Sequence, residues 1–196
     1  MRLLSIQELA ICSALAASAA AVFGGYFPVT AVIATAYLTF VVAAITVSDA
    51  RRFIIPDVLS LPAIPAGILA SWLISVGDGW HAAMTSLLGA LLGGASLYAI
   101  KAGYAWIKDV DGLGLGDVKL FAAGGAWLGP TNLAVTLLLA SLAAIVSLFL
   151  SVAITGRRDV TRMTAIPFGA FIAPAIWLIW MFEQIWPNQL VGLPGL

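Results

Sequence analysis

Near its middle the chain reads Gly112-Leu113-Gly114-Leu115-Gly116-Asp117-Val118-Lys119, and a long apolar run resumes at this aspartate. Glycine has no Cβ, so it adopts backbone angles closed to other residues and lets another segment approach closely. A carboxylate at the edge of a bilayer is costly unless it has a partner or a task. The stretch therefore predicts a second acid opposite Asp117, and Asp49 is the early candidate.

The composition indicates a polytopic membrane protein. Charged residues make up 9% of the chain and hydrophobic residues 62%, whereas soluble domains carry roughly 25% charge. The net charge is zero, so nothing favours nucleic acid as a partner. Cys12 is the single cysteine and His81 the single histidine. We therefore expect no disulfide, no Cys-x-x-Cys zinc site, no metal and no cofactor.

A ruler of about 20 apolar residues per spanning helix predicts an all-α transmembrane helix bundle of six to seven spans, forming one membrane-embedded domain over 1–196. The segment from 117 is short because Gly129-Pro130 interrupts it. Ser5 and Glu8 fit a capping box, and we expect the first helix to be retained rather than cleaved as a signal peptide. The predicted apolar segments are 6–23, 28–48, 57–76, 82–100, 117–130, 132–154 and 166–186.

The basic residues predict the orientation. Counted from a cytoplasmic N-terminus, every Lys and Arg lies at that terminus or around the loops after the second, fourth and sixth helices, and the other loops have none. The positive-inside rule places such loops in the cytoplasm, so Asp49 and Asp117 should both lie at the cytoplasmic face. The nine residues are Arg2, Arg51, Arg52, Lys101, Lys108, Lys119, Arg157, Arg158 and Arg162.

Most of the acidic residues have an ordinary location in a loop or at a helix end. Asp57 follows Pro56 and opens an apolar run, as an N-capping aspartate does. Asp49 ends one apolar segment and Asp117 begins another at comparable depth, so we favour a working pair. The alternative for each is an interfacial acid paired with a nearby cation, which would be Arg51, Arg52 or Lys119.

Two neighbouring carboxylates in a low-dielectric site cannot both ionise easily, so they share one proton. Such a pair suits hydrolysis, because the ionised group activates a water and the protonated group polarises a carbonyl. The pair titrates as a unit, and the proton is assigned to neither residue. Glycines at 112, 114 and 116 would leave room for an extended peptide beside the acids.

Three motifs in order resemble the type IV prepilin peptidases, which are membrane aspartic proteases of the Gly-x-Gly-Asp class. Residues 112–120 resemble their signature loop. Asp49 followed by Ile55-Pro56-Asp57 resembles the first-aspartate motif, and Ile166-Pro167-Phe168-Gly169-Ala170-Phe171 resembles a third motif before the last helix. The similarity covers about residues 45 to 180.

The resemblance implies that Asp49 and Asp117 form the catalytic dyad of a bacterial inner-membrane enzyme. It implies prepilins or pseudopilins of type IV pili, type II secretion or tight-adherence pili as substrates. Their short basic leader would be cut from the following hydrophobic helix at the cytoplasmic face. The loop and supporting residues would be Gly112, Gly114, Gly116, Lys119, Pro56, Asp57, Pro167, Phe168 and Gly169.

Bifunctional members of that family carry a cytoplasmic domain near the N-terminus, often with paired Cys-x-x-Cys zinc motifs, and also methylate the new N-terminus. Here the first loop is a few residues long and Cys12 is the only cysteine. We therefore expect a peptidase-only form, similar to those of tight-adherence systems, without methyltransferase activity.

Three other interpretations remain. Signal peptide peptidase and presenilin share the Gly-x-Gly-Asp loop, but they have Tyr-Asp and Pro-Ala-Leu motifs, which are absent at matching places here. A small proton-coupled transporter would have acids near the bilayer midplane and repeated halves. A purely structural membrane scaffold explains the composition but leaves the glycine run without a reason.

Overall fold

The computed structural model describes residues 4–24, 27–108, 112–155 and 167–186, and within them the chain is all-α. This confirms the predicted fold class. Arg2, Arg157, Arg158, Arg162 and Ile166 lie outside the described residues. The helices are α1 (Ile6–Phe23), α2 (Val29–Arg52), α3 (Asp57–Ile74), α4 (Gly79–Lys108), α5 (Leu115–Leu128), α6 (Leu133–Thr155) and α7 (Gly169–Ile185).

Four of the helices, namely α2, α3, α4 and α6, are long and apolar enough to cross a membrane. The chain is a multi-pass membrane protein. Helices α1 and α7 are apolar but shorter. At 14 residues, α5 extends only about 21 Å, less than the roughly 30 Å of a hydrocarbon core. The predicted interruption at Gly129-Pro130 thus leaves a helix too short to span the membrane on its own.

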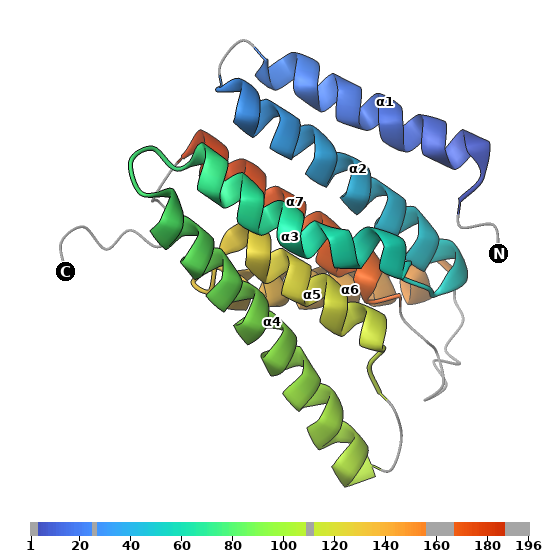
Figure 1. The fold of residues 1–196 in the computed structure, drawn as a ribbon. Coiled ribbons are helices and arrows are strands. Elements are labelled where there is room, and N and C mark those ends of the chain that lie inside the picture. Colours follow the sequence, from blue (N-terminus) through green and yellow to red (C-terminus); the bar gives the residue numbers. More distant parts are fainter. Residues whose placement is uncertain (1–3, 25–26, 109–111, 156–166, 187–196) are drawn as a thin grey trace.

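The longest helix exceeds its predicted segment. We predicted 82–100, but α4 continues to Lys108 and reaches 30 residues. Lys101 directly follows the predicted segment, and its ammonium group finds a partner by donating to the Leu113 carbonyl at 2.9 Å. The last turns of α4 extend beyond the other helices (Figure 1). This extension brings Lys101 beside the glycine-rich loop.

The helices pack around α2, α3, α5 and α7, with α4 against α3 and α5, α6 against α7, and α1 on the outer side of α2 (Figure 1). Phe121 of α5, Ile45 of α2 and Ile172 of α7 are fully buried where these helices meet. Indole N–H groups inside the bundle find acceptors, as buried tryptophans require. Trp127 donates to the Ala63 carbonyl at 2.9 Å and Trp180 donates to the Thr35 hydroxyl at 3.1 Å.

Helices α4 and α5 touch backbone to backbone. A Cβ added to Gly89 would lie 2.2 Å from the Gly125 carbonyl oxygen, and one added to Gly125 would lie 2.0 Å from the Gly89 oxygen. A Cβ on Gly93 would come within 2.7 Å of the Phe121 oxygen. Small residues allow this approach in membranes, where close packing drives helix association. The contact fixes the height of α5, and with it Asp117, against the long α4.

The capping box at the start of α1 forms as predicted, with Ser5 and Glu8 each accepting a backbone N–H of the other. The structure adds a contact that spacing along the chain does not reveal. Glu8 is 6% exposed and binds Arg51 at 2.7 Å and Arg52 at 3.2 Å. This ion-pair cluster joins the start of α1 to the end of α2, one turn beyond Asp49.

Candidate active site

Asp49 and Asp117 line the same small cavity. Asp49 lies in the last turn of α2 and Asp117 in the first turn of α5. The cavity has a volume of about 240 Å³, and its other lining residues are Phe53, Ile54, Ile55, Asp57, Gly114 and Gly116. The two acids that the sequence singled out, 68 positions apart in the numbering, are therefore brought together by the fold.

Gly169, at the start of α7, lies where the two carboxylates meet. A Cβ at this position would be 3.0 Å from Asp49 Oδ2 and 3.1 Å from Asp117 Oδ1. Both oxygens thus border one point in space, which brings the two carboxylates within the range where one like charge disfavours the other. Any side chain at this position would press on both carboxylates and on the end of the Ile55 side chain.

The first turn of α7 supplies hydrogen-bond donors to the pair. The Ala170 amide donates to Asp49 Oδ2 at 2.7 Å, and the Gly169 backbone lies beside both carboxylates. The free amides at a helix N-terminus stabilise a nearby negative charge. Sequence reasoning placed this segment near the site but missed Ala170 as a donor. Its only signal was the position of Pro167-Phe168-Gly169 before an apolar run.

Pro167 and Phe168 form the turn that starts α7. Phe168 is the residue before the helix, and its carbonyl accepts from the Ile172 amide at 3.0 Å. The Pro167 carbonyl accepts from the Ala170 amide at 3.1 Å, so this amide serves both the turn and Asp49. Neither side chain lines the cavity. The turn formed by Pro167 and Phe168 directs the N-terminus of α7 toward the two carboxylates.

Ile55 closes one side of the site, a role that sequence reasoning did not assign. A Cβ on Gly116 would lie 3.0 Å from the Ile55 Cβ, and one on Gly169 would lie 2.4 Å from its Cδ1. The Ile55 side chain therefore lies against α5 and α7 at once. Pro56 follows it, is buried, and precedes the first residue of α3. The Ile55-Pro56-Asp57 motif thus joins the three helix ends around the dyad.

The glycine loop is held from α4. A Cβ on Gly112 would lie 2.5 Å from the Tyr104 ring, and Lys101 binds the Leu113 carbonyl at 2.9 Å. The space left by Gly112 is thus filled by the protein itself, not left for a substrate as we had expected. Of the glycines at 112, 114 and 116, Gly114 is the one whose Cβ would meet the acid, at 3.2 Å from Asp117 Oδ2.

Asp57 is not the N-cap that the sequence predicted. It is the first residue of α3, Pro56 occupies the cap position, and no side chain caps this helix. The Asp57 carboxylate instead accepts from Lys119 Nζ, with both oxygens at 2.8 Å. A tertiary partner outcompeted the local cap. This pair links the starts of α3 and α5 at the rim of the cavity.

The cations that could have neutralised the dyad are engaged with other carboxylates. Arg51 and Arg52 bind Glu8, and Lys119 binds Asp57. The sequence alternative, in which Asp49 and Asp117 are interfacial acids paired with these cations, is therefore not the arrangement found. Among the described residues, no group of three or more His, Cys, Asp or Glu side chains could hold a metal ion.

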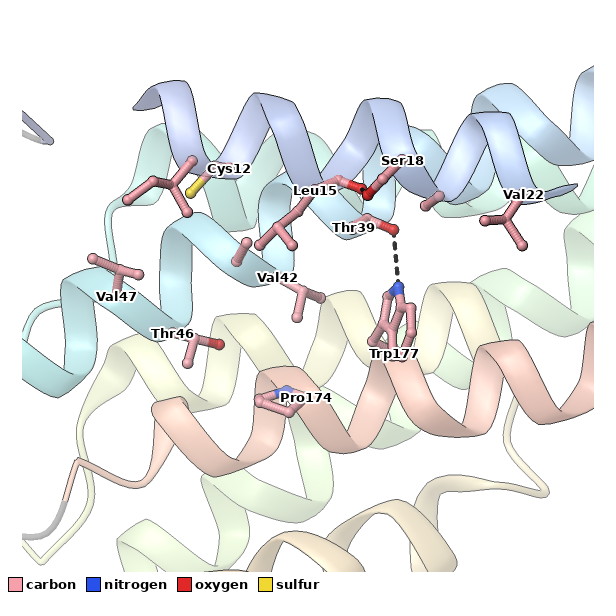
Figure 2. Close-up of a pocket in the computed structure, with 13 residues that line it drawn as sticks. Cys12, Leu15, Ser18, Val22, Thr39, Val42, Thr46, Val47, Pro174 and Trp177 are labelled. Atoms are coloured by element: carbon pink, nitrogen blue, oxygen red, sulfur yellow. Dashed lines mark hydrogen bonds between the residues drawn. The ribbon is translucent and has the colours of Figure 1, made fainter. Parts of the chain in front are cut away.

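A larger cavity, of about 560 Å³, lies between α1, α2 and α7 and is almost wholly apolar. In Figure 2 its polar groups include the Thr39 hydroxyl, which accepts from the Trp177 indole at 2.9 Å, and the thiol of Cys12. No acidic or basic side chain lines it. It offers no acid–base chemistry, so the smaller cavity around Asp49 and Asp117 is the candidate active site.

A family model described as the type IV leader peptidase family matches residues 36–150. The match includes both Asp49 and Asp117 and covers more than half of the chain. The chain belongs to this family. The segment Pro167–Gly169, which meets the dyad in space, lies beyond the matched residues of this leader peptidase family member.

Curated relatives of this family member are named prepilin leader peptidase/N-methyltransferase. The protein from Aeromonas hydrophila is 35% identical over 76% of this chain and 49% of its own length. That from Pseudomonas aeruginosa is 35% identical over 78% and 49%, and that from Burkholderia pseudomallei 31% over 82% and 48%. The chain thus spans about half the length of these relatives. No solved structure gave a significant match.

Proposed function

We propose that this chain is a membrane aspartic endopeptidase that removes the short basic leader from prepilins or pseudopilins. The observation that carries the proposal is the meeting of Asp49 and Asp117 around the Gly169 backbone. Paired carboxylates that share a proton are the machinery of aspartic peptidases. The names of the relatives support the substrate class, since each is a prepilin leader peptidase.

In this mechanism the ionised carboxylate takes a proton from a water, whose oxygen attacks the scissile carbonyl carbon. The protonated carboxylate donates its proton to the carbonyl oxygen, and a tetrahedral diol forms. Transfer of a proton to the amide nitrogen then breaks the C–N bond and releases the leader. The amides of Gly169 and Ala170 orient the pair and hold its single negative charge next to the α7 N-terminus.

The site is proposed to work at the cytoplasmic face. Arg51, Arg52, Lys101 and Lys119 all lie at the end of the bundle that carries the dyad, as their contacts with Glu8, Leu113 and Asp57 require. The loops at the other end contain no Lys or Arg. The positive-inside rule places the basic end in the cytoplasm, where a basic leader would arrive.

The competing functions have less support. Both acids lie in terminal turns of helices, not at the middle of long helices where a transporter would place its proton relay. The three relatives reported above are each named prepilin leader peptidase/N-methyltransferase and not signal peptide peptidase or presenilin. Their names join two activities, and the dyad accounts for the peptidase alone. We therefore propose cleavage without methyl transfer by this chain.

The test is cleavage of a candidate prepilin by membranes that contain the chain. The prepilin is co-expressed with wild type or with a variant carrying Asp49→Asn, and the product is weighed by mass spectrometry. We expect a mature pilin without its leader and without an added methyl group in the wild-type sample only. Equal cleavage in both samples would remove Asp49 from the mechanism, and a methylated product would contradict the peptidase-only proposal.

A further inference from the structure

Phe53 is the only residue other than glycine with a positive φ in the described part of the chain, at φ 54° and ψ 34°. This left-handed conformation is disfavoured for residues with a Cβ, and an aromatic residue there is a clear outlier. Glycine or asparagine normally takes such a position at a helix C-terminus. The chain therefore retains a phenyl ring at a site where a smaller residue would fold more easily.

The backbone role of this residue does not require the ring. The Phe53 N–H ends α2 by donating to the Asp49 carbonyl at 2.9 Å, and glycine would donate equally well. Nor does packing within the chain compensate, because the residue is 55% exposed. Backbone strain of this kind tends to persist at functional sites.

Phe53 lines the same cavity as Asp49 and Asp117. Ile54 lies beside it, 48% exposed, and its carbonyl accepts from the Ser48 hydroxyl at 2.8 Å, which fixes the turn. Together with Ile55, these two exposed apolar residues form the apolar wall of the cavity, whose other lining residues are acids and glycines. Whatever occupies the cavity beside the carboxylates must contact this wall.

We propose that Phe53, together with Ile54, contacts the substrate and holds the first apolar side chain after the scissile bond. The inference rests on the proposed peptidase function, in which a basic leader is followed by an apolar segment. The apolar wall matches the segment after the cut, because apolar side chains gain free energy when they are buried against one another, whereas the charges of a basic leader are better served by water or by acids. Contact with substrate would bury the ring and offset the strain of its backbone.

The experiment compares wild type with Phe53→Gly in detergent, using a synthetic leader peptide and a second peptide whose first apolar residue after the cut is replaced by serine. We expect Phe53→Gly to raise KM about tenfold, as loss of part of a buried phenyl group predicts. The kcat should stay within about twofold, because the carboxylates are untouched. The melting temperature should be equal or higher, since glycine adopts this backbone freely.

The serine peptide distinguishes a Phe53 ring that contacts the substrate from one that only contacts lipid. When wild type cuts the serine peptide, KM should rise as much as it does when Phe53→Gly cuts the original peptide. When Phe53→Gly cuts the serine peptide, KM should rise little further, because the two changes remove one and the same interaction. Phe53→Asn, which also tolerates the left-handed region, guards against a folding defect peculiar to glycine. The matched control is Val58→Ala, an apolar residue that is 61% exposed outside the cavity, whose KM should not change.

Three results would overturn the inference. One is an unchanged KM in both Phe53 variants. Another is a raised KM with a lowered melting temperature in both, which would make Phe53 structural. The third is that the rise in KM caused by the Phe53 variant and the rise caused by the serine peptide multiply when the two are combined, because independent effects would mean that the two groups do not interact. If wild type fails to cut either peptide, the proposed function fails and this inference fails with it, whereas cleavage with normal KM in the variants overturns only the assignment of Phe53.

Discussion

The amide of Ala170 donates a 2.7 Å hydrogen bond to Asp49 Oδ2, across 121 residues of chain. This contact joins the start of the last described helix to the first acid of the dyad. It explains why a segment beyond the two aspartates belongs to the site. Because α7 begins at Gly169, the approach of its backbone sets the position of both carboxylates.

Replacing either aspartate should abolish cleavage while leaving the fold intact. Asn keeps the shape of Asp but can neither activate a water nor share a proton, so Asp49→Asn and Asp117→Asn should each lose about 10³-fold or more in kcat. The assay is leader removal in membranes, with protein level measured on the same samples. Asp78→Asn is the control, since its side chain is exposed away from the dyad, and full activity in either dyad variant would refute the pairing.

Gly169→Ala should damage activity more than any other single methyl group added near the site. Its Cβ would lie 2.4 Å from Ile55 Cδ1 and about 3 Å from both carboxylate oxygens, so the Ile55 side chain must turn away and the carboxylates must move by a few tenths of an ångström. A misplacement of a full ångström costs about 10²-fold in rate, and for this smaller shift we expect a loss of roughly tenfold, which single-turnover cleavage would measure. Gly103→Ala meets nothing within 4 Å and should stabilise α4 by about 1 kcal/mol with unchanged activity.

Asp57→Asn should be mild. The Asp57–Lys119 pair is substantially exposed, and such pairs contribute about 0–1 kcal/mol, so cleavage should fall less than about fivefold. Lys119→Met should lower cleavage by a similar factor. In the double variant, the loss of activity, expressed as a free energy, should not exceed the sum of the two single losses. Steady-state cleavage gives the comparison. A dead Asp57→Asn together with an active Asp49→Asn would mean that the first catalytic aspartate is misassigned.

Lys101→Met should slow cleavage without unfolding the bundle. The lysine reaches from α4 to the Leu113 carbonyl, and loss of a hydrogen bond to a charged group, about 1.5–3 kcal/mol, should loosen the loop that leads to Asp117. We expect roughly a tenfold fall in kcat and little change in KM. Lys108→Met, at the exposed end of α4, is the matched control. Equal activity in the two variants would show that cleavage does not depend on the hydrogen bond between Lys101 and Leu113.

The features that could be predicted are those written locally in the chain. Apolar segments of spanning length gave the all-α bundle, and the capping box at Ser5 and Glu8 formed as expected. The Gly-Asp stretch marked Asp117, and Asp49 was found because it ends an apolar segment at matching depth. Both acids line one cavity, although their catalytic role stays a prediction.

What could not be predicted depends on contacts between distant segments. Nothing near Ala170 indicates that its amide meets Asp49, and nothing near Glu8 indicates that it binds Arg51 and Arg52. The local sequence rule predicted Asp57 as an N-cap, but in the structure its carboxylate binds Lys119, which is 62 residues away in the chain. Gly112 was expected to leave open space, which a ring from another helix fills.

The backbone contact between Gly89 and Gly125 has a consequence for mutational screening. Neither position tolerates even a methyl group without moving a carbonyl of the other helix, so a saturation library scored by pilus assembly would reject every substitution there as firmly as at the aspartates. From such a screen alone, these two packing positions would be mistaken for catalytic residues. Parallel scoring of protein abundance would sort them, because variants at these glycines should vanish from the membrane while inert aspartate variants accumulate normally.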